Sequence, residues 1–181
     1  MLKVEGLNAG YGSVNILWDI GFEVKDGEIV AILGSNGAGK TTMVRTITGM
    51  VKASSGKVEF NGEDLSGKSS RVILDSGIVQ VPEGRQLFTD MTVLEYLKFV
   101  AELKKIPKDQ RKKQILEVMN LVKITDMQNR LIKNLSKGYR QRVGLAQAVL
   151  GYPPIIILDE PTVGLDPKQI IEIRDLIKSL G

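Results

Sequence analysis

The sequence predicts an α/β fold whose core is a mainly parallel sheet. Strand-like and helix-like segments alternate along most of the 181 residues, as they do in folds of this class. Two short runs are almost wholly apolar, residues 28–33 (EIVAIL) and residues 155–158 (IIIL), as strands buried on both faces require. A glycine-rich loop joins the first run to a helix-like segment. Together these three observations favour an α/β sheet over an all-α or all-β fold.

The first third of the chain contains further strand-like segments. Residues 3–7 and 20–24 have mixed strand character and flank a Gly-Tyr-Gly turn. Residues 57–60 alternate apolar and polar side chains and meet Asn-Gly, a typical hairpin turn. Residues 77–81 form a further strand that Pro82 ends.

Helical patterns follow the loop and fill the middle of the chain. Residues 40–50 have helical composition, and residues 92–103 place apolar side chains on one broad face. A second middle helix begins near Pro107, and its basic first turn is either a solvated face or a docking surface. Residues 136–150 and 168–180 are the last two predicted helices. The stretch from about 92 to 147 therefore reads as a helical insert on the sheet.

Composition excludes several kinds of chemistry. The chain has no cysteine and no histidine, so it has no disulfide, thiol nucleophile, imidazole base or ordinary zinc site. A catalytic base must be Asp, Glu, Lys or Tyr. The longest apolar stretch, residues 148–158, is too short and too interrupted to span a bilayer, and residues 1–5 lack the apolar core of a signal peptide. We therefore expect a cytoplasmic location.

The glycine-rich loop reads GSNGAGKT and fits the spacing G-x-x-x-x-G-K-[ST]. Glycines let backbone N–H groups turn toward phosphate oxygens, and the helix N-terminus favours the same anion. In this pattern the lysine reaches the β- and γ-phosphates and the first threonine binds Mg²⁺. The residues expected to bind ATP here are Gly34, Ser35, Asn36, Gly37, Ala38, Gly39, Lys40, Thr41 and Thr42.

The second apolar run supplies the acidic groups that such a loop needs. It ends in Asp159 and Glu160 at its carboxyl end, the edge where α/β sheets bind ligands. Asp159 is expected to hold Mg²⁺ through its water shell, together with Thr41. Glu160 is the candidate that orients or deprotonates the attacking water.

Residues 135–139, LSKGY, complete a resemblance to the ATP-binding cassette (ABC) family, the ATPase subunits of ABC transporters. The family signature reads LSGGQ, and its Ser and second Gly contact the ATP of the partner subunit, a role that falls on Ser136 and Gly138. Lys137 replaces a glycine, and either adds positive charge near the phosphate or points to solvent. Tyr11 stands where the family stacks an aromatic ring on adenine, although a tyrosine between two glycines also suits a turn. Residues 163–166 match the D-loop, which couples the two subunits.

The resemblance also places a glutamine-loop residue, with a catalytic and metal-binding role, at Glu83 within Pro-Glu-Gly-Arg. Gln80 is the alternative, although it falls three residues early, on the predicted strand. The first half resembles ATPases of branched-chain amino-acid importers, whereas the second half is more similar to exporter or gliding-type ATPases. A chimeric or inferred sequence would explain this mixture.

The resemblance implies one ABC ATPase domain over residues 1–181, with an N-terminal antiparallel sheet. Residues 1–91 and 148–181 are the expected nucleotide-binding core, and residues 92–147 the helical subdomain. The family has a switch histidine on a central strand after the last helix here, and the chain contains no histidine. We therefore expect a truncated cassette that lacks this strand.

The implied function is ATP hydrolysis with Mg²⁺ in a head-to-tail homodimer or heterodimer that drives membrane-spanning transporter subunits, possible cargo being branched-chain amino acids. The protein would lie on the inner face of the cell membrane and bind no nucleic acid. One alternative is a cassette that binds ATP but hydrolyses it poorly. Another is a soluble ABC protein outside transport.

Overall fold

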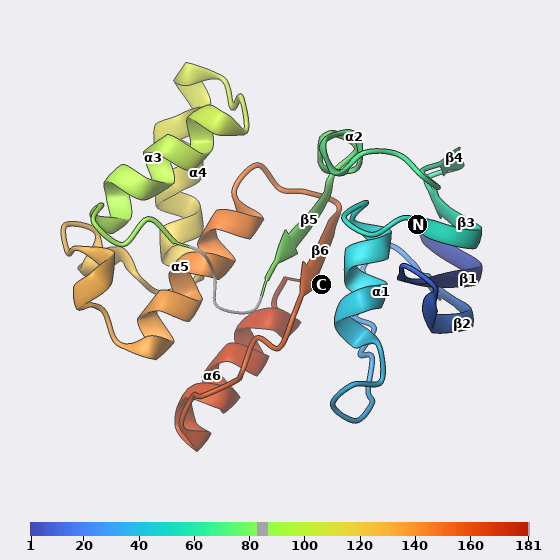
Figure 1. Cartoon of the computed structure of the whole chain (residues 1–181). Helices are drawn as coiled ribbons and strands as arrows, with labels where there is room; N and C mark the ends of the chain where they lie inside the picture. The colour runs from blue at the N-terminus through green and yellow to red at the C-terminus, as the bar shows by residue number, and fades with distance from the viewer. Residues whose placement is uncertain (83–86, 181) are drawn as a thin grey trace. The chain divides into compact units, whose positions relative to one another are not determined.

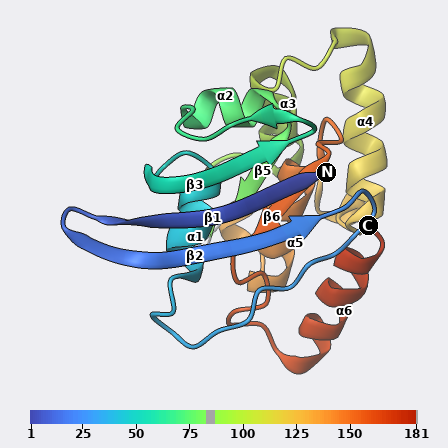
Figure 2. The same ribbon diagram turned by 90° about the vertical axis from the view of Figure 1, so that its right-hand side faces the viewer.

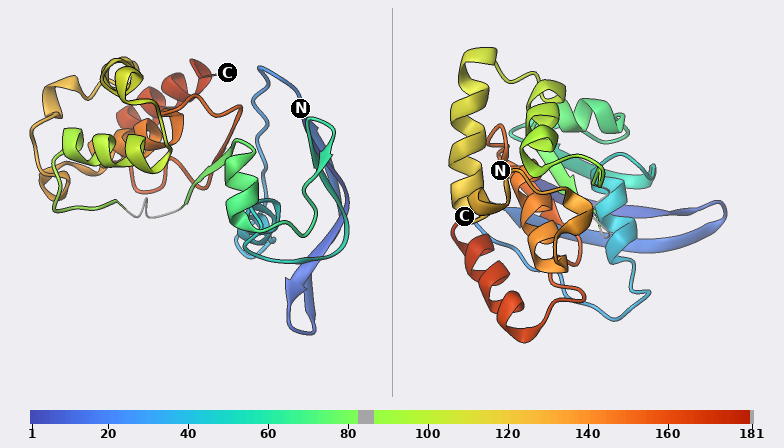
Figure 3. Two further views of the ribbon diagram at one scale, coloured as in Figure 1. Left: turned by 90° about the horizontal axis from the view of Figure 1, so that it is seen from above. Right: turned by 90° about the vertical axis from the view of Figure 1, so that its left-hand side faces the viewer.

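The computed structural model describes residues 1–82 and 87–180, which contain two compact units, Met1–Val79 and Gln80–Leu180. The first unit contains a four-stranded antiparallel sheet with the order β2-β1-β3-β4. Figure 2 shows β2, β1 and β3 side by side. Helices α1 and α2 lie on the same side of this sheet (Figure 3, left). The antiparallel N-terminal sheet is thereby confirmed. The elements are β1 (Leu2–Tyr11), β2 (Val14–Val24), α1 (Lys40–Ile47), β3 (Ala53–Phe60), β4 (Glu63–Asp64) and α2 (Ser70–Asp75).

A bulge in β1 explains why the sequence pattern understates this strand. Leu2 and Val4 are buried, and the buried positions then shift by one to Leu7 and Ala9. Gly6 lies between them at a φ of 58°, where the pairing with β2 and β3 changes register. A bulge inserts one residue and so breaks a strict alternation. The strand continues to Tyr11 rather than ending near residue 7.

The second unit is built around helices. Its elements are α3 (Val93–Leu103), α4 (Lys108–Leu121), η1 (Thr125–Met127), η2 (Ile132–Asn134), α5 (Lys137–Val149), β6 (Ile155–Leu158) and α6 (Pro167–Lys178). Figure 1 shows the helices α3, α4, α5 and α6 of this unit. Their buried side chains form one continuous core. β5 (Ile78–Val81) spans the boundary between the units and pairs with β6 in a two-stranded sheet.

Turn and capping signals mark several element ends. Asn61 and Gly62 have φ values of 50° and 85° and connect β3 to β4 in a tight hairpin. Thr92 begins α3 with a capping box, and Ser136 caps α5. Pro167 occupies the first turn of α6. Local hydrogen bonding decides these ends, which is why the sequence alone finds them.

The predicted buried strand at residues 28–33 is wrong. These residues form no helix or strand, and their apolar side chains are exposed, Ile29 to 52% and Leu33 to 91%. A strand needs a neighbour that satisfies its backbone N–H and C=O groups. Among the described residues, neither sheet includes this segment. β6 forms as predicted, but its side chains are half-buried rather than fully buried.

Candidate functional site

The phosphate loop, residues 34–41, leads into α1 in the first unit. Gly37 and Gly39 have φ values of 84° and 91°, a region that side chains other than glycine rarely adopt. A β-carbon on Gly39 would lie 2.9 Å from a methyl carbon of Leu17 on β2. The loop therefore requires glycine at residue 39 both for its backbone conformation and for its close approach to the sheet.

Lys40 folds back over this loop. Its Nζ donates hydrogen bonds to the backbone oxygens of Gly34 at 2.8 Å and Ser35 at 3.0 Å. The first N–H groups of α1 have no partner within the helix. An ammonium group beside N–H groups that still need acceptors is suited to bind an anion, and phosphate oxygens can replace the two carbonyls as partners of Lys40.

Tyr11, at the end of β1, reaches the same helix. The Arg45 guanidinium, followed by the Thr42 hydroxyl, lowers the pKa of the Tyr11 hydroxyl. Thr41 is exposed in the first turn of α1, whereas Thr42 is buried. The structure thus brings Tyr11 beside the helix that the phosphate loop opens. Arg45 was not singled out from the sequence, because nothing local marks it as a partner of Tyr11.

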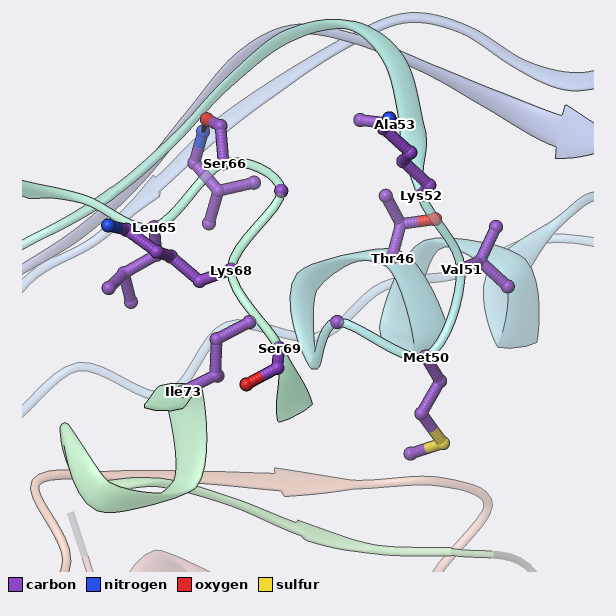
Figure 4. A pocket seen from close by; sticks show the side chains of 13 residues that line it. Thr46, Met50, Val51, Lys52, Ala53, Leu65, Ser66, Lys68, Ser69 and Ile73 are labelled. Atoms are coloured by element: carbon purple, nitrogen blue, oxygen red, sulfur yellow. Dashed lines mark hydrogen bonds between the residues drawn. The ribbon is translucent and has the colours of Figure 1, made fainter. Parts of the chain in front are cut away.

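A pocket of about 290 Å³ lies elsewhere in the first unit (Figure 4). It lies at the carboxyl end of α1, whereas the phosphate loop adjoins the amino end of that helix. None of the predicted site residues lines it. Its lining residues are Thr46, Gly49, Met50, Val51, Lys52, Ala53, Val58, Leu65, Ser66, Gly67, Lys68, Ser69 and Ile73.

The acidic pair lies in the second unit, at the carboxyl end of β6. The backbone N–H of Asp159 donates to the carbonyl of Val81 on β5 at 3.0 Å, which fixes this strand end. Glu160 is exposed and has a φ of 48°, a left-handed conformation that is strained for a residue with a side chain. Its carbonyl accepts the N–H of Val163 at 3.2 Å in a tight turn. Such strain is concentrated at functional sites.

The signature segment forms the start of α5 in the same unit. The Ser136 hydroxyl accepts the N–H of Tyr139 at 3.3 Å, and Gly138 is buried. A β-carbon on Gly138 would lie 2.9 Å from Gln169 of α6, so this glycine permits close packing. Lys137 lies over Gly164 in the D-loop, with its Cε 2.7 Å from the position of a β-carbon there. Neither interpretation of Lys137 from the sequence anticipated this contact.

Glu83 and Gln80 are the two predicted candidates for the glutamine-loop residue. Glu83 lies outside the described residues. Gln80 lies on β5 and is half-buried, so its predicted place on the strand is confirmed. The first unit thus brings together Tyr11 and residues 34–42. The second holds Asp159, Glu160, Ser136 and Gly138.

Comparisons with known proteins identify the family. The family model described as "ABC transporter" matches residues 17–163 of the chain. The chain is 40% identical over 182 residues to the uncharacterized ABC transporter ATP-binding protein YdbJ of Bacillus subtilis, a match over 100% of this chain and 57% of YdbJ. It is 35% identical over 181 residues to the high-affinity branched-chain amino acid transport ATP-binding protein BraG of Pseudomonas aeruginosa, over 99% of this chain and 77% of BraG.

A solved structure gives the same result. The structure of cbiO1 from Clostridium perfringens, part of the ABC transporter complex cbiONQ, matches with a TM-score of 0.89 and 33% identity, over 99% of this chain and 72% of cbiO1. The chain therefore belongs to the ATP-binding domains of the ABC transporter family, and the predicted fold class is confirmed. It spans 57% of the length of YdbJ. Among the described residues, no helix is long and apolar enough to cross a membrane.

Proposed function

We propose that this chain binds ATP at residues 34–42 and Tyr11 and serves as the ATPase part of an ABC transporter. One observation carries the proposal: the Lys40 ammonium is held by two loop carbonyls beside the unpaired N–H groups that open α1. This arrangement offers a triphosphate both a cation and a row of donors. Stacking of adenine on Tyr11 is part of the same proposal.

Magnesium fits the donors that the proposal provides. The Thr41 hydroxyl and the Asp159 carboxylate are the hard oxygen ligands that Mg²⁺ prefers, and it commonly takes only one or two protein ligands plus phosphate oxygens and water. Thr41 is exposed at the start of α1, and Asp159 lies at the end of β6. Bound Mg²⁺ would neutralise charge that develops on the phosphates. Glu83 is proposed as a third contributor.

We assign hydrolysis to Glu160, whose carboxylate would hold the attacking water. Its exposure leaves the carboxylate accessible, and its strained backbone is set by the turn that includes Val163. Ser136 and Gly138 would contact the ATP of a second ABC subunit, so that two chains share two sites. Residues 1–91 and 148–181 as core and 92–147 as helical subdomain remain the proposed domain division.

The proposed partners are an identical or related ABC subunit and membrane-spanning transporter subunits at the inner face of the membrane. BraG, by its name, belongs to branched-chain amino acid transport, and this likeness supports that cargo as the finer proposal. A chain that binds ATP but hydrolyses it slowly is the second candidate. Residues 28–33, directly before the phosphate loop, form no strand and are exposed, and this favours the second candidate.

Replacement of Lys40 by alanine tests the phosphate site. ATP with Mg²⁺ at about 100 times its dissociation constant should stabilise the wild-type chain by about 2.7 kcal/mol. We expect K40A to lose this gain, because the ammonium can no longer bind phosphate. The measurement is the thermal unfolding midpoint with and without nucleotide. K98A, which removes an exposed lysine from α3, is the control and should keep the gain. Equal stabilisation of wild type and K40A would refute the assignment.

A further inference from the structure

The turn that joins α3 to α4 carries the net charge of the whole chain. Residues 102–113 contain six basic and two acidic side chains, which gives a formal net charge of +4, and the net charge of all 181 residues is also +4. Basic and acidic residues therefore balance in the rest of the sequence. Figure 1 shows this turn at one end of the helical unit. Positive charge concentrated in this way attracts an anionic partner.

The backbone of this turn is held in place by hydrogen bonds. The N–H of Ile106 donates to the carbonyl of Ala101 at 3.0 Å, and the Ile106 side chain is buried. The Nε of Arg111 donates to the carbonyl of Ile106 at 2.7 Å, and its guanidinium forms an ion pair with Glu102 at 3.6 Å. Lys104 donates to three carbonyls at the end of α5. Arg111 and Lys104 are thus engaged within the fold.

The remaining cations of the turn face solvent. Lys105, Lys108 and Lys112 are exposed, and the ion pairs of residues 1–82 and 87–180 include none of the three. Lys113 lies 3.8 Å from Glu117, and its side chain is 80% exposed. Lys108 is in the first turn of α4, where positive charge opposes the helix dipole. A bound anion would offset this unfavourable interaction.

The side chains of the turn suit a lipid surface better than a single anion. A lysine ammonium is a compact, hydrated charge, whereas the planar fork of arginine suits bidentate recognition of one phosphate or carboxylate. Leu103 is 59% exposed directly before the lysines, and Leu116, one turn beyond Lys112, is 40% exposed. Exposed apolar side chains beside lysines fit the boundary between headgroups and acyl chains. Residues 102–116 include no aromatic side chain that could stack on a nucleic-acid base.

We propose that the α3–α4 turn, through Lys105, Lys108, Lys112 and Leu103, binds the anionic surface of a phospholipid membrane. The lysines would lie among the headgroups, and the leucine would enter the boundary with the acyl chains. The proposal goes beyond the proposed function, because it requires neither ATP nor a transporter subunit.

Cosedimentation of the 181-residue chain with vesicles, without nucleotide, tests the proposal. The chain should bind vesicles of equal parts phosphatidylcholine and phosphatidylglycerol and should not bind phosphatidylcholine alone. Raising the salt from about 0.01 M to about 0.15 M shortens the screening length from about 30 Å to about 8 Å and should release it. The triple variant K105Q/K108Q/K112Q should bind about 100-fold more weakly, which is about fivefold for each charge. L103S should bind about threefold to tenfold more weakly, because it loses an apolar side chain.

The triple variant K25Q/K52Q/K68Q is the matched control. It removes three exposed lysines of the first unit and changes the net charge equally. It should bind the mixed vesicles like wild type. Both triple variants should keep the unfolding midpoint of wild type, because substitutions of exposed side chains change stability little.

Several outcomes overturn the proposal. Equal binding to phosphatidylcholine vesicles, or equal losses in the two triple variants, would show that the charges of this turn do not direct binding. An L103S variant that binds like wild type, with duplex DNA or polyglutamate competing as well as the mixed vesicles, would identify a general surface for polyanions. Nucleotide is absent from these measurements, so a failure of ATP binding would refute the proposed function and leave this result unaffected.

Discussion

The Lys104 side chain binds the carboxyl end of helix α5 in the second unit. Its Nζ donates to the backbone oxygens of Gln147 at 2.8 Å, Ala148 at 2.9 Å and Leu150 at 2.6 Å, at the end of α5. The last carbonyls of a helix have no intrahelical partner, and a cation there is favoured by the helix dipole. Burial acts in the opposite direction and lowers the pKa of Lys104 to about 8.

This lowered pKa predicts a pH dependence of stability. Below about pH 8, Lys104 is protonated in both the folded and the unfolded chain, so it does not make the free energy of unfolding depend on pH. Between about 8 and the ordinary value of 10.5, the folded chain loses the proton that the unfolded chain keeps, so the free energy of unfolding rises with pH. A neutral amine still donates two hydrogen bonds to the carbonyls. Urea unfolding of wild type and K104M between pH 7.5 and 10 measures the difference, which should grow with pH in favour of wild type. Parallel curves would contradict the prediction.

The sequence singles out candidate site residues where the signal is local. Lys40 and Glu160 are predicted because each stands at a fixed position in a short sequence pattern. The approach of the Lys137 side chain to Gly164 joins residues that are far apart in the sequence. Such contacts depend on tertiary packing, and no local pattern encodes them.

At the scale of elements, the helices and the antiparallel strands were largely predictable, and residues 28–33 were not. Helices satisfy their own backbone groups and carry their caps in sequence, as Thr92 and Asp166 do. A strand depends on a partner that its own residues do not specify. An apolar run therefore usually indicates a strand, but the same run forms no strand in a chain where it has no neighbouring strand to pair with.

Leucine-to-alanine changes distinguish an exposed segment from a buried strand. Leu33 is 91% exposed and Leu7 is 0% exposed. We expect L7A to lower the free energy of unfolding by about 2–5 kcal/mol and L33A by less than about 0.5 kcal/mol. Chemical denaturation measures both. A cost for L33A as large as that for L7A would mean that residues 28–33 form a buried strand in solution.

For the whole molecule, the proposed shared sites predict that ATP controls assembly. Glu160→Gln keeps the size of the side chain but removes the carboxylate that would hold water, so bound ATP should persist and a dimer should accumulate. Size-exclusion chromatography with ATP and Mg²⁺ detects it. E102Q, a change of an exposed glutamate on α3, is the control and should behave as wild type. An E160Q chain that binds ATP and remains monomeric would count against the shared-site mechanism.

Binding and turnover should separate in this chain. The proposed nucleotide site consists of the phosphate loop, the start of α1 and Tyr11, all of which are formed in the first unit. Turnover also needs a rigid loop and donors near the γ-phosphate, yet residues 28–33 form no strand, and the 181 residues include no histidine. Loss of one well-placed donor typically lowers turnover by about 10²–10³-fold.

We therefore expect the 181-residue chain to release phosphate from ATP about 10²-fold more slowly than BraG measured under the same conditions, while it keeps measurable affinity for ATP. Phosphate release at saturating ATP gives the rate, and E160Q provides the background. The three basic residues of α6, Lys168, Arg174 and Lys178, are the remaining candidates to supply positive charge, and their alanine variants should leave the slow rate unchanged. Turnover of about 1–10 per second that E160Q abolishes would overturn the prediction, because that rate lies within the usual range for enzymes. It would also show that a formed strand at residues 28–33 is dispensable for catalysis.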